Sequence, residues 1–248
     1  MPIKVGICGA SMPKQKLAEL FDVAEVQQTF YEPPKPETLA KWRAETPQPF
    51  EYTIKAWQLI THSGKSPTYR RLKRELSAEE RGEVGAFRDT AIVEEGWRRT
   101  RESAEAIGAQ RILFQCPASF TPTSENLQNL MQFFTRGDRE SSERKFTFLF
   151  EPRGEQWTDE LLVDLCTELD LVHVVDPFFR QTVTPNRPYY RLHGRPNASG
   201  RSTYSYVYED SELHDLKELV TGTDAYVMFN NVKMRQDAVR FKELLSHK

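Results

Sequence analysis

The stretch F-T-F-L-F-E-P-R, residues 146 to 153, decides the predicted fold. Side chains alternate between the two faces of a strand, so the three phenylalanines face one way and Leu149, Glu151 and Arg153 the other. An apolar row on one face, with charges at the C-terminal end of the other, is typical of a closed α/β barrel. In such a barrel, helices cover the outer face and functional polar groups gather at the C-terminal mouth.

Seven further apolar runs of similar length accompany this one, and polar residues close each of them. They cover residues 3–9, 23–31, 51–57, 111–117, 171–178, 188–194 and 225–231. Apolar residues recur at helical spacing between most of these runs, but only a short proline-rich segment separates 171–178 from 188–194. The sequence therefore predicts one (β/α)8 TIM-barrel domain over residues 1–248, with helix six missing or very short.

Length and composition limit the classes of function. The 248 residues match the roughly 250 that such a barrel needs, and no apolar run approaches the roughly 20 residues that span a bilayer, so no membrane partner is expected. The N-terminus lacks the pattern of a signal peptide, which predicts a cytoplasmic protein. A net charge of −2 excludes a uniformly basic nucleic-acid binder but allows a local basic patch.

The three cysteines, Cys8, Cys116 and Cys166, are odd in number and have no C-x-x-C spacing. This indicates neither a disulfide framework nor a thiolate zinc site.

A basic segment, residues 65–74, lies inside a region from residue 61 to about 89 that shows no sustained periodicity. Five cations occur there with no acid among them: Lys65, Arg70, Arg71, Lys73 and Arg74. A loop of this length is usually functional or disordered, and we expect it to be mobile. It is either a solvated face or lid, or a surface that contacts the phosphates of a nucleic acid.

The strand ends carry most of the candidate site residues. In chain order they are Cys8, Glu25, Gln27, Lys55, Gln115, Glu151, Arg153, Asp176, Arg191, His193 and Asn230. Charged side chains are rarely buried unless they are paired, so this concentration predicts a functional site at the C-terminal mouth. The alternative is a scaffold of buried ion pairs, with Glu151 bound to Arg191 and Asp176 bound to Arg153 or Lys55.

Roles follow from the chemistry of these groups. Glu151, Asp176 and His193 are the candidate catalytic residues, because carboxylates and imidazole move protons. Substrate binding is assigned to Glu25, Gln27, Lys55, Gln115, Arg153, Arg191 and Asn230. Because neighbouring strands are close, we expect Glu151, Arg153, Asp176, Arg191 and His193 to form one coupled cluster.

A tightly bound metal is not expected at this site. Glu151, Asp176 and His193 suit zinc or manganese, but Lys55 and the two arginines would repel a dication. The sequence leaves the cofactor unknown and does not identify the substrate.

Eight motifs make the chain resemble the YecE-like family called "domain of unknown function 72". They are E-V-Q-Q-T-F-Y (25–31), K-W-R-A-E-T-P (41–47), F-E-Y-T-I-K-A-W-Q-L-I-T-H (50–62), L-F-Q-C-P (113–117), F-E-P-R-G (150–154), V-V-D-P-F (174–178), Y-R-L-H-G (190–194) and V-M-F-N-N (227–231). They occur in order along nearly the whole chain.

The resemblance implies a TIM barrel related to endonuclease IV and xylose isomerase, with no assigned activity. It places family motif positions on most of the residues named above and adds His62 to the substrate-binding set. One departure is that I-C-G-A-S-M-P follows Gly6, where the family commonly has G-x-S-G-W/F-x-Y. Residues 7–13 of this chain contain none of the aromatic residues of that pattern.

Three functions remain open at this stage. The first is a hydrolase or isomerase that acts on an anionic or polyhydroxylated small molecule at the barrel mouth. The second is a nucleic-acid-binding protein of endonuclease IV-like ancestry that uses residues 65–74. The third is a non-catalytic barrel that binds a small molecule, since barrels host unrelated chemistries.

Overall fold

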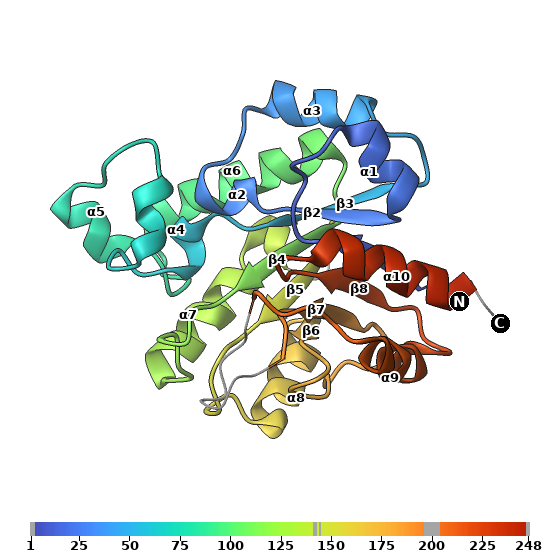
Figure 1. The fold of residues 1–248 in the computed structure, drawn as a ribbon. Coiled ribbons are helices and arrows are strands. Elements are labelled where there is room, and N and C mark those ends of the chain that lie inside the picture. The colour runs from blue at the N-terminus through green and yellow to red at the C-terminus, as the bar shows by residue number, and fades with distance from the viewer. Residues whose placement is uncertain (1–2, 141–142, 144, 196–203, 247–248) are drawn as a thin grey trace. The chain divides into compact units, whose positions relative to one another are not determined.

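Eight parallel strands close into a barrel in the computed structural model, which describes residues 3–140, 143, 145–195 and 204–246 (Figure 1). The strands are β1 (Lys4–Ile7), β2 (Val23–Val26), β3 (Glu51–Lys55), β4 (Arg111–Gln115), β5 (Thr147–Glu151), β6 (Leu171–Val175), β7 (Tyr189–Leu192) and β8 (Tyr226–Phe229). They neighbour one another in chain order, and β8 pairs with β1. The predicted α/β barrel is thereby confirmed.

Helices connect the strands in the described part of the chain. They are α1 (Lys14–Leu20), α2 (Gln28–Tyr31), α3 (Pro36–Ala44), α4 (Gln58–Thr61), η1 (Pro67–Arg71), α5 (Ala78–Glu83), α6 (Ala91–Ile107), α7 (Ser124–Phe134), η2 (Gly137–Arg139), α8 (Asp159–Glu168), α9 (Asp210–Val220) and α10 (Met234–Ser246). Within the described residues, none of these helices is both long and apolar enough to cross a bilayer.

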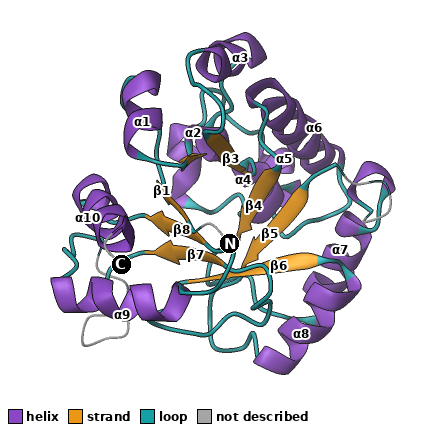
Figure 2. Cartoon of the chain, turned by 90° about the vertical axis from the view of Figure 1, so that its right-hand side faces the viewer, coloured by secondary structure: helices purple, strands orange, loops and turns teal. Residues whose placement is uncertain are grey.

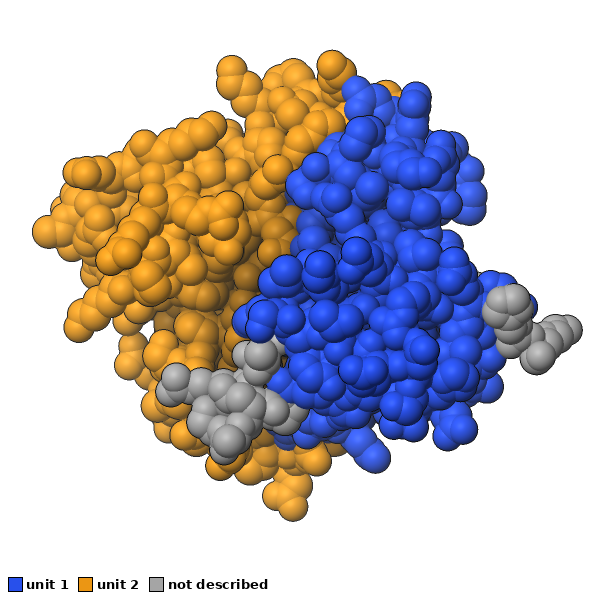
Figure 3. Space-filling view, viewed as in Figure 1, with its two compact units in different colours: residues 1–26, 45–52, 173–248 blue, residues 27–44, 53–172 orange. Residues whose placement is uncertain are grey.

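The contacts of the chain group into two compact units, coloured separately in Figure 3. Unit 1 comprises residues 1–26, 45–52 and 173–248, and unit 2 comprises residues 27–44 and 53–172. The assignment of the whole chain to one domain stays a prediction.

The phenylalanines of β5 pack as the alternation predicts. Helices α6 and α7 lie outside β4 and β5 in unit 2 (Figure 2). The ring of Phe148 is 5.6 Å from that of Trp97 in α6 and 5.4 Å from that of Phe134 in α7. All three side chains are buried, and burying a phenylalanine stabilises the fold by roughly 1.5–3 kcal/mol. This apolar outer row leaves Glu151 on the opposite face of the strand.

Helix six is absent, as predicted. All residues from 176 to 188 are described, and none of them is helical. The Asp176 carboxylate accepts the backbone N–H of Phe178 at 3.1 Å, which holds the chain in a turn directly after β6. A side chain that bonds to the nearby backbone in this way favours a turn over a helix.

Strand β2 is shorter than the sequence predicts. It ends at Val26, and the helical turn α2 replaces the expected strand residues up to Tyr31. The Thr29 hydroxyl donates to the Lys55 carbonyl oxygen at 2.6 Å, a contact that period-two alternation does not reveal. Gln27 and Thr29 therefore lie outside the strand: Gln27 caps α2 and Thr29 belongs to it.

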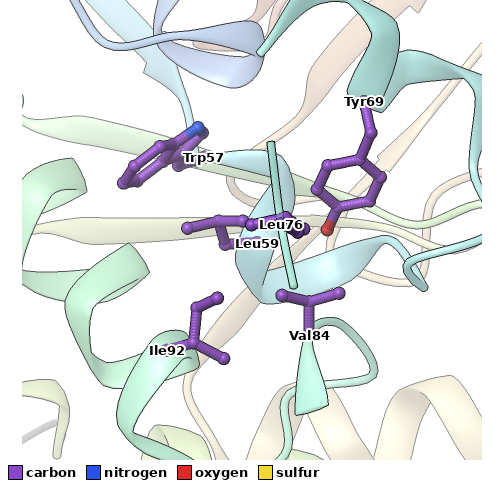
Figure 4. Packing of buried hydrophobic residues seen from close by; sticks show 6 residues of the cluster. All are labelled: Trp57, Leu59, Tyr69, Leu76, Val84 and Ile92. Carbon is purple, nitrogen blue, oxygen red and sulfur yellow. The ribbon is translucent and has the colours of Figure 1, made fainter. Parts of the chain in front are cut away.

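The expectation of irregular structure over residues 61–89 is also wrong. η1 and α5 lie there, and Tyr69, Leu76 and Val84 join Trp57, Leu59 and Ile92 in a buried cluster, which we call the side core (Figure 4). The apolar residues that form it are irregularly spaced, so no period indicates the packing. The segment thus has a hydrophobic core of its own.

Contacts also hold two of the five cations of the basic segment. Arg71 lies 3.5 Å over the ring of Tyr31, and Arg74 donates to Glu80 at 2.8 Å. Both contacts lie within unit 2.

Candidate functional site

Three predicted site residues end neighbouring strands of unit 2. Lys55 is the last residue of β3, Gln115 of β4 and Glu151 of β5. The Lys55 Nζ donates to Gln115 Oε1 at 2.8 Å, and Gln115 lies opposite Glu151 in the strand register. All three are buried, with 5–9% of their surface exposed. We call these residues, together with Arg153, the lysine cluster.

The Lys55 ammonium lies against an aromatic ring as well as an amide. Its Nζ is 3.6 Å from the centroid of the Phe30 ring, and Gln115 in turn donates to the Cys116 carbonyl oxygen at 2.5 Å. A cation over an aromatic face is attracted by the ring quadrupole. The amine is therefore held in a defined position at the strand ends.

Arg153 adds a second cation to the cluster. Its Nη2 donates to Glu151 Oε1 at 3.3 Å, and about a third of its side chain is exposed, whereas the Glu151 side chain is almost fully buried. Two cations and one carboxylate give the lysine cluster an excess of one positive charge. Such a set attracts anions while retaining a group that can exchange protons.

Cys116 follows β4 and is fully buried in the same unit. Burial, and then the charge of Glu151, raises the pKa of this thiol well above its usual value, although Lys55 and Arg153 oppose the shift. The residue is therefore a thiol rather than a reactive thiolate.

His62, which follows α4, belongs to the same surroundings. Burial, and then the charges of Lys55 and Arg153, lowers the pKa of His62 from 6.5 to about 3. Its ring packs edge-on against Phe30 at 4.8 Å, and its Nδ1 is 2.7 Å from the Thr61 hydroxyl. A neutral imidazole is a hydrogen-bonding group rather than an anion clamp.

In unit 1, Arg191 binds Glu25. The Arg191 guanidinium donates to the two Glu25 carboxylate oxygens at 2.8 and 3.1 Å, and both side chains are fully buried. The hydroxyl of Tyr189 lies 3.5 Å from the same carboxylate. This bidentate pair joins β2 to β7, whereas the scaffold alternative paired Arg191 with Glu151.

Asp176, His193 and Asn230 also meet in unit 1. The Asp176 carboxylate accepts the backbone N–H of His193 at 2.8 Å, and Asn230 Nδ2 lies 3.0 Å from His193 Nδ1. The His193 ring also packs edge-on against Tyr204 at 5.6 Å. Asp176 thus binds the backbone at His193, and Asn230 contacts its imidazole.

These contacts distribute the predicted residues over both units. Unit 2 contains Gln27, Lys55, His62, Gln115, Glu151 and Arg153. Unit 1 contains Cys8, Glu25, Asp176, Arg191, His193 and Asn230. The coupling of Glu151 and Arg153 with Asp176, Arg191 and His193 stays a prediction, as do the catalytic and binding roles of all the predicted residues.

The sequence reasoning missed two residues beside Lys55. Thr29 binds its carbonyl oxygen and Phe30 packs on its amine. Both belong to the motif E-V-Q-Q-T-F-Y, but a continuous strand over residues 23–31 does not predict the helical turn that brings them to Lys55.

Metal ligands do not group in the described residues: no three His, Cys, Asp or Glu side chains there are arranged to hold an ion. The absence of a tightly bound metal from the protein stays a prediction.

Comparison of the sequence with known families gives one match over most of the chain. The profile of the family described as "Protein of unknown function DUF72" matches residues 14–248. No match was found among curated proteins.

Solved structures share the fold. A DUF72 family protein from Enterococcus faecalis V583 is 22% identical with a TM-score of 0.70, and the match covers 99% of this chain and 98% of that one. A D-psicose 3-epimerase is 13% identical over 93% and 90% of the two chains, with a TM-score of 0.56. Endonuclease IV from Thermus thermophilus is 10% identical over 98% of both chains, with a TM-score of 0.52. At these identities the similarity concerns the fold alone.

Proposed function

Since the chain belongs to the DUF72 family of proteins of unknown function, we propose from its own residues that it is an enzyme. The reaction is of the hydrolase or isomerase type, and the substrate is a small anionic or polyhydroxylated molecule bound at the C-terminal ends of the strands. The lysine cluster carries this proposal, because a buried lysine, amide and carboxylate end three neighbouring strands beside a partly exposed arginine. The C-terminal ends of barrel strands are where TIM-barrel enzymes hold their catalytic groups.

Substrate binding in this proposal relies on the excess positive charge. Lys55 and Arg153 attract a carboxylate or phosphate, and a partly desolvated site strengthens that attraction. The Gln115 amide and the neutral His62 ring bind hydroxyl groups, since both offer a donor and an acceptor.

Glu151 is the proposed proton carrier of the cluster. As a carboxylate it removes a proton from the substrate, and as the resulting acid it returns one, which is the role of a general acid–base group. His193 is a second candidate, assigned to unit 1. The proposal also locates the protein in the cytoplasm, a reducing compartment that suits a chain whose three cysteines are all buried.

Fold similarity is compatible with more than one substrate class. The epimerase acts on a sugar by its name and endonuclease IV on a nucleic acid, but barrels of one fold host unrelated chemistries. The charge and the hydrogen-bonding groups of the lysine cluster therefore carry more weight than the neighbours do.

Thermal unfolding in the presence of ligands tests the binding step. A hexose phosphate, an aldonic acid and the free hexose are compared on the wild type, on Lys55→Met and on Lys73→Met, which removes an exposed lysine of the same unit. A ligand at 100 times its Kd adds about 2.7 kcal/mol and raises Tm by roughly 5–10 °C. We expect this rise for the anionic compounds, its loss in Lys55→Met and its retention in Lys73→Met.

Glu151→Gln then separates catalysis from binding. The amide keeps the shape of the side chain but does not exchange protons, so a bound compound is expected to be converted about 10²–10⁴ times more slowly. Stabilisation that is equal in all variants would contradict the proposed site. A ligand that binds through Lys55 and is never converted would indicate the non-catalytic barrel instead.

A further inference from the structure

A basic pocket of about 650 Å³ lies in unit 2, within the region that the sequence leaves without periodicity. Its lining includes Gly64, Lys65, Tyr69, Arg70, Arg74 and Arg81. Its volume falls in the range of roughly 300–1,000 Å³ that is usual for small-molecule sites. No residue of the lysine cluster lines it.

The walls of the pocket are fixed by packing and capping. Gly64 lies so close to the Arg81 backbone that a Cβ atom would clash with the Arg81 carbonyl oxygen. Helix α5 begins with a complete capping box, in which Ser77 and Glu80 bind each other's backbone N–H. The pocket is thus formed between two segments that approach closely.

Its floor is apolar and belongs to the side core. Tyr69 and Leu76 are buried in that core, and Leu72 packs against it (Figure 4). The hydroxyl of Tyr69 donates to the His62 carbonyl oxygen at 2.8 Å, which fixes the ring in place. A preformed apolar floor of this kind suits a ring or a short hydrocarbon part of a ligand.

Positive charge dominates the rim. Four lining residues are cations, and Glu75 is the only acid among the lining residues. Arg74 pairs with Glu80, and Arg81 donates to the Gly64 carbonyl oxygen at 3.2 Å. Within the described residues, the side chains of Lys65 and Arg70 form no hydrogen bond or ion pair. Two cations without a protein partner thus share one hollow with two further arginines.

From this arrangement we infer that the basic pocket binds a small phosphate-bearing molecule, with its phosphate at Lys65 and Arg70 and its apolar part over Tyr69, Leu72 and Leu76. A phosphate carries about 1.5–2 negative charges at neutral pH and strong acceptor oxygens, which arginine binds in a bidentate manner. Nucleic acid needs cations spread along its backbone. The gathering of the cations in one hollow therefore favours a compact ligand.

Calorimetric titration with inorganic pyrophosphate at low ionic strength tests the phosphate end of the site. Lys65→Gln/Arg70→Gln removes the two cations that lack partners. Lys16→Gln/Lys233→Gln removes two exposed lysines outside the pocket and changes the net charge equally. We expect pyrophosphate to bind the wild type, the first double variant to bind at least roughly tenfold more weakly, and the second to bind as the wild type does. The comparison is repeated in the Lys55→Met background, where Lys65→Gln/Arg70→Gln is expected to cause the same loss of pyrophosphate binding, which separates this site from the lysine cluster.

Three results would overturn the inference. One is the absence of pyrophosphate binding by the wild type, and another is an equal loss in both double variants, since only net charge would then matter. The third is a single-stranded oligothymidine that binds through Lys65 and Arg70 and is not displaced by pyrophosphate. That result would assign the surface to nucleic acid.

Discussion

Acidification is expected to destabilise the protein through His62, which the native state keeps neutral. Its pKa is about 3 in the folded chain and close to 6.5 in the unfolded one. Below pH 6.5 the unfolded state binds a proton that the folded state does not, so stability falls as the pH drops from 6.5 towards 3. Above pH 6.5 both states are neutral at this residue, and its contribution to the pH dependence disappears.

The magnitude follows from linkage. A pH of 5 is about 1.5 units below the pKa of the unfolded imidazole, which is therefore protonated. The folded imidazole, with a pKa of about 3, is almost fully neutral at that pH. Each unit corresponds to 1.36 kcal/mol, so His62 lowers the free energy of unfolding by about 2 kcal/mol between pH 8 and pH 5. For a domain of this size the loss lowers Tm by roughly 4–8 °C.

Urea denaturation at a series of pH values measures this effect in the wild type and in His62→Asn. Asparagine places an amide that does not titrate near the position of Nδ1, next to the Thr61 hydroxyl. Other titrating groups are common to both proteins, so the difference between their curves isolates His62. The exposed His214, replaced in the same way, controls for the removal of a histidine as such. Parallel curves from pH 8 to pH 5 would refute the buried, neutral assignment.

The remaining predictions concern stability and are measured by urea denaturation. Arg191→Met leaves the Glu25 carboxylate buried without its guanidinium and is expected to cost on the order of 3–5 kcal/mol of stability. Adding Glu25→Gln should restore part of that stability. A double variant as unstable as Arg191→Met would show that Arg191 and Glu25 are not coupled. Gly64→Ala forces a Cβ against the Arg81 carbonyl and is expected to cost about 1–3 kcal/mol of stability. In Gly82→Ala the new Cβ meets nothing within 4 Å, so this change should stabilise α5 by about 0.5–1 kcal/mol. Similar effects at both glycines would contradict the close approach of Gly64 to Arg81. For His193→Ala the site hypothesis predicts a change of about 1 kcal/mol or less, because water can replace the lost side chain; a loss of several kcal/mol would assign His193 to the scaffold.

The fold could be predicted from local patterns. Alternation in residues 146–153 predicted which side of β5 meets the helices, and the contacts of Phe148 with Trp97 and Phe134 confirm it. The short connection before β7 predicted the missing helix six. These features depend on the period of a strand and on the length of a connection, and both can be read from a short continuous segment of sequence.

The ends of the strands were less predictable. Alternation alone does not distinguish the last residues of a strand from a helical turn of apolar and polar residues, so α2 was assigned to β2. The side core could not be predicted from the sequence either. Its members, among them Leu59, Tyr69 and Leu76, have no common period and meet only when the segment folds on itself.

The sequence by itself placed the candidate residues at strand ends, and tertiary structure decided their partners. Arg191 binds Glu25, 166 positions away, and Asp176 accepts the backbone N–H of His193. Such pairings depend on the relative register of strands that are distant in sequence and on the direction that each side chain takes. Neither is encoded in a local pattern, because both are fixed only when the strands pair.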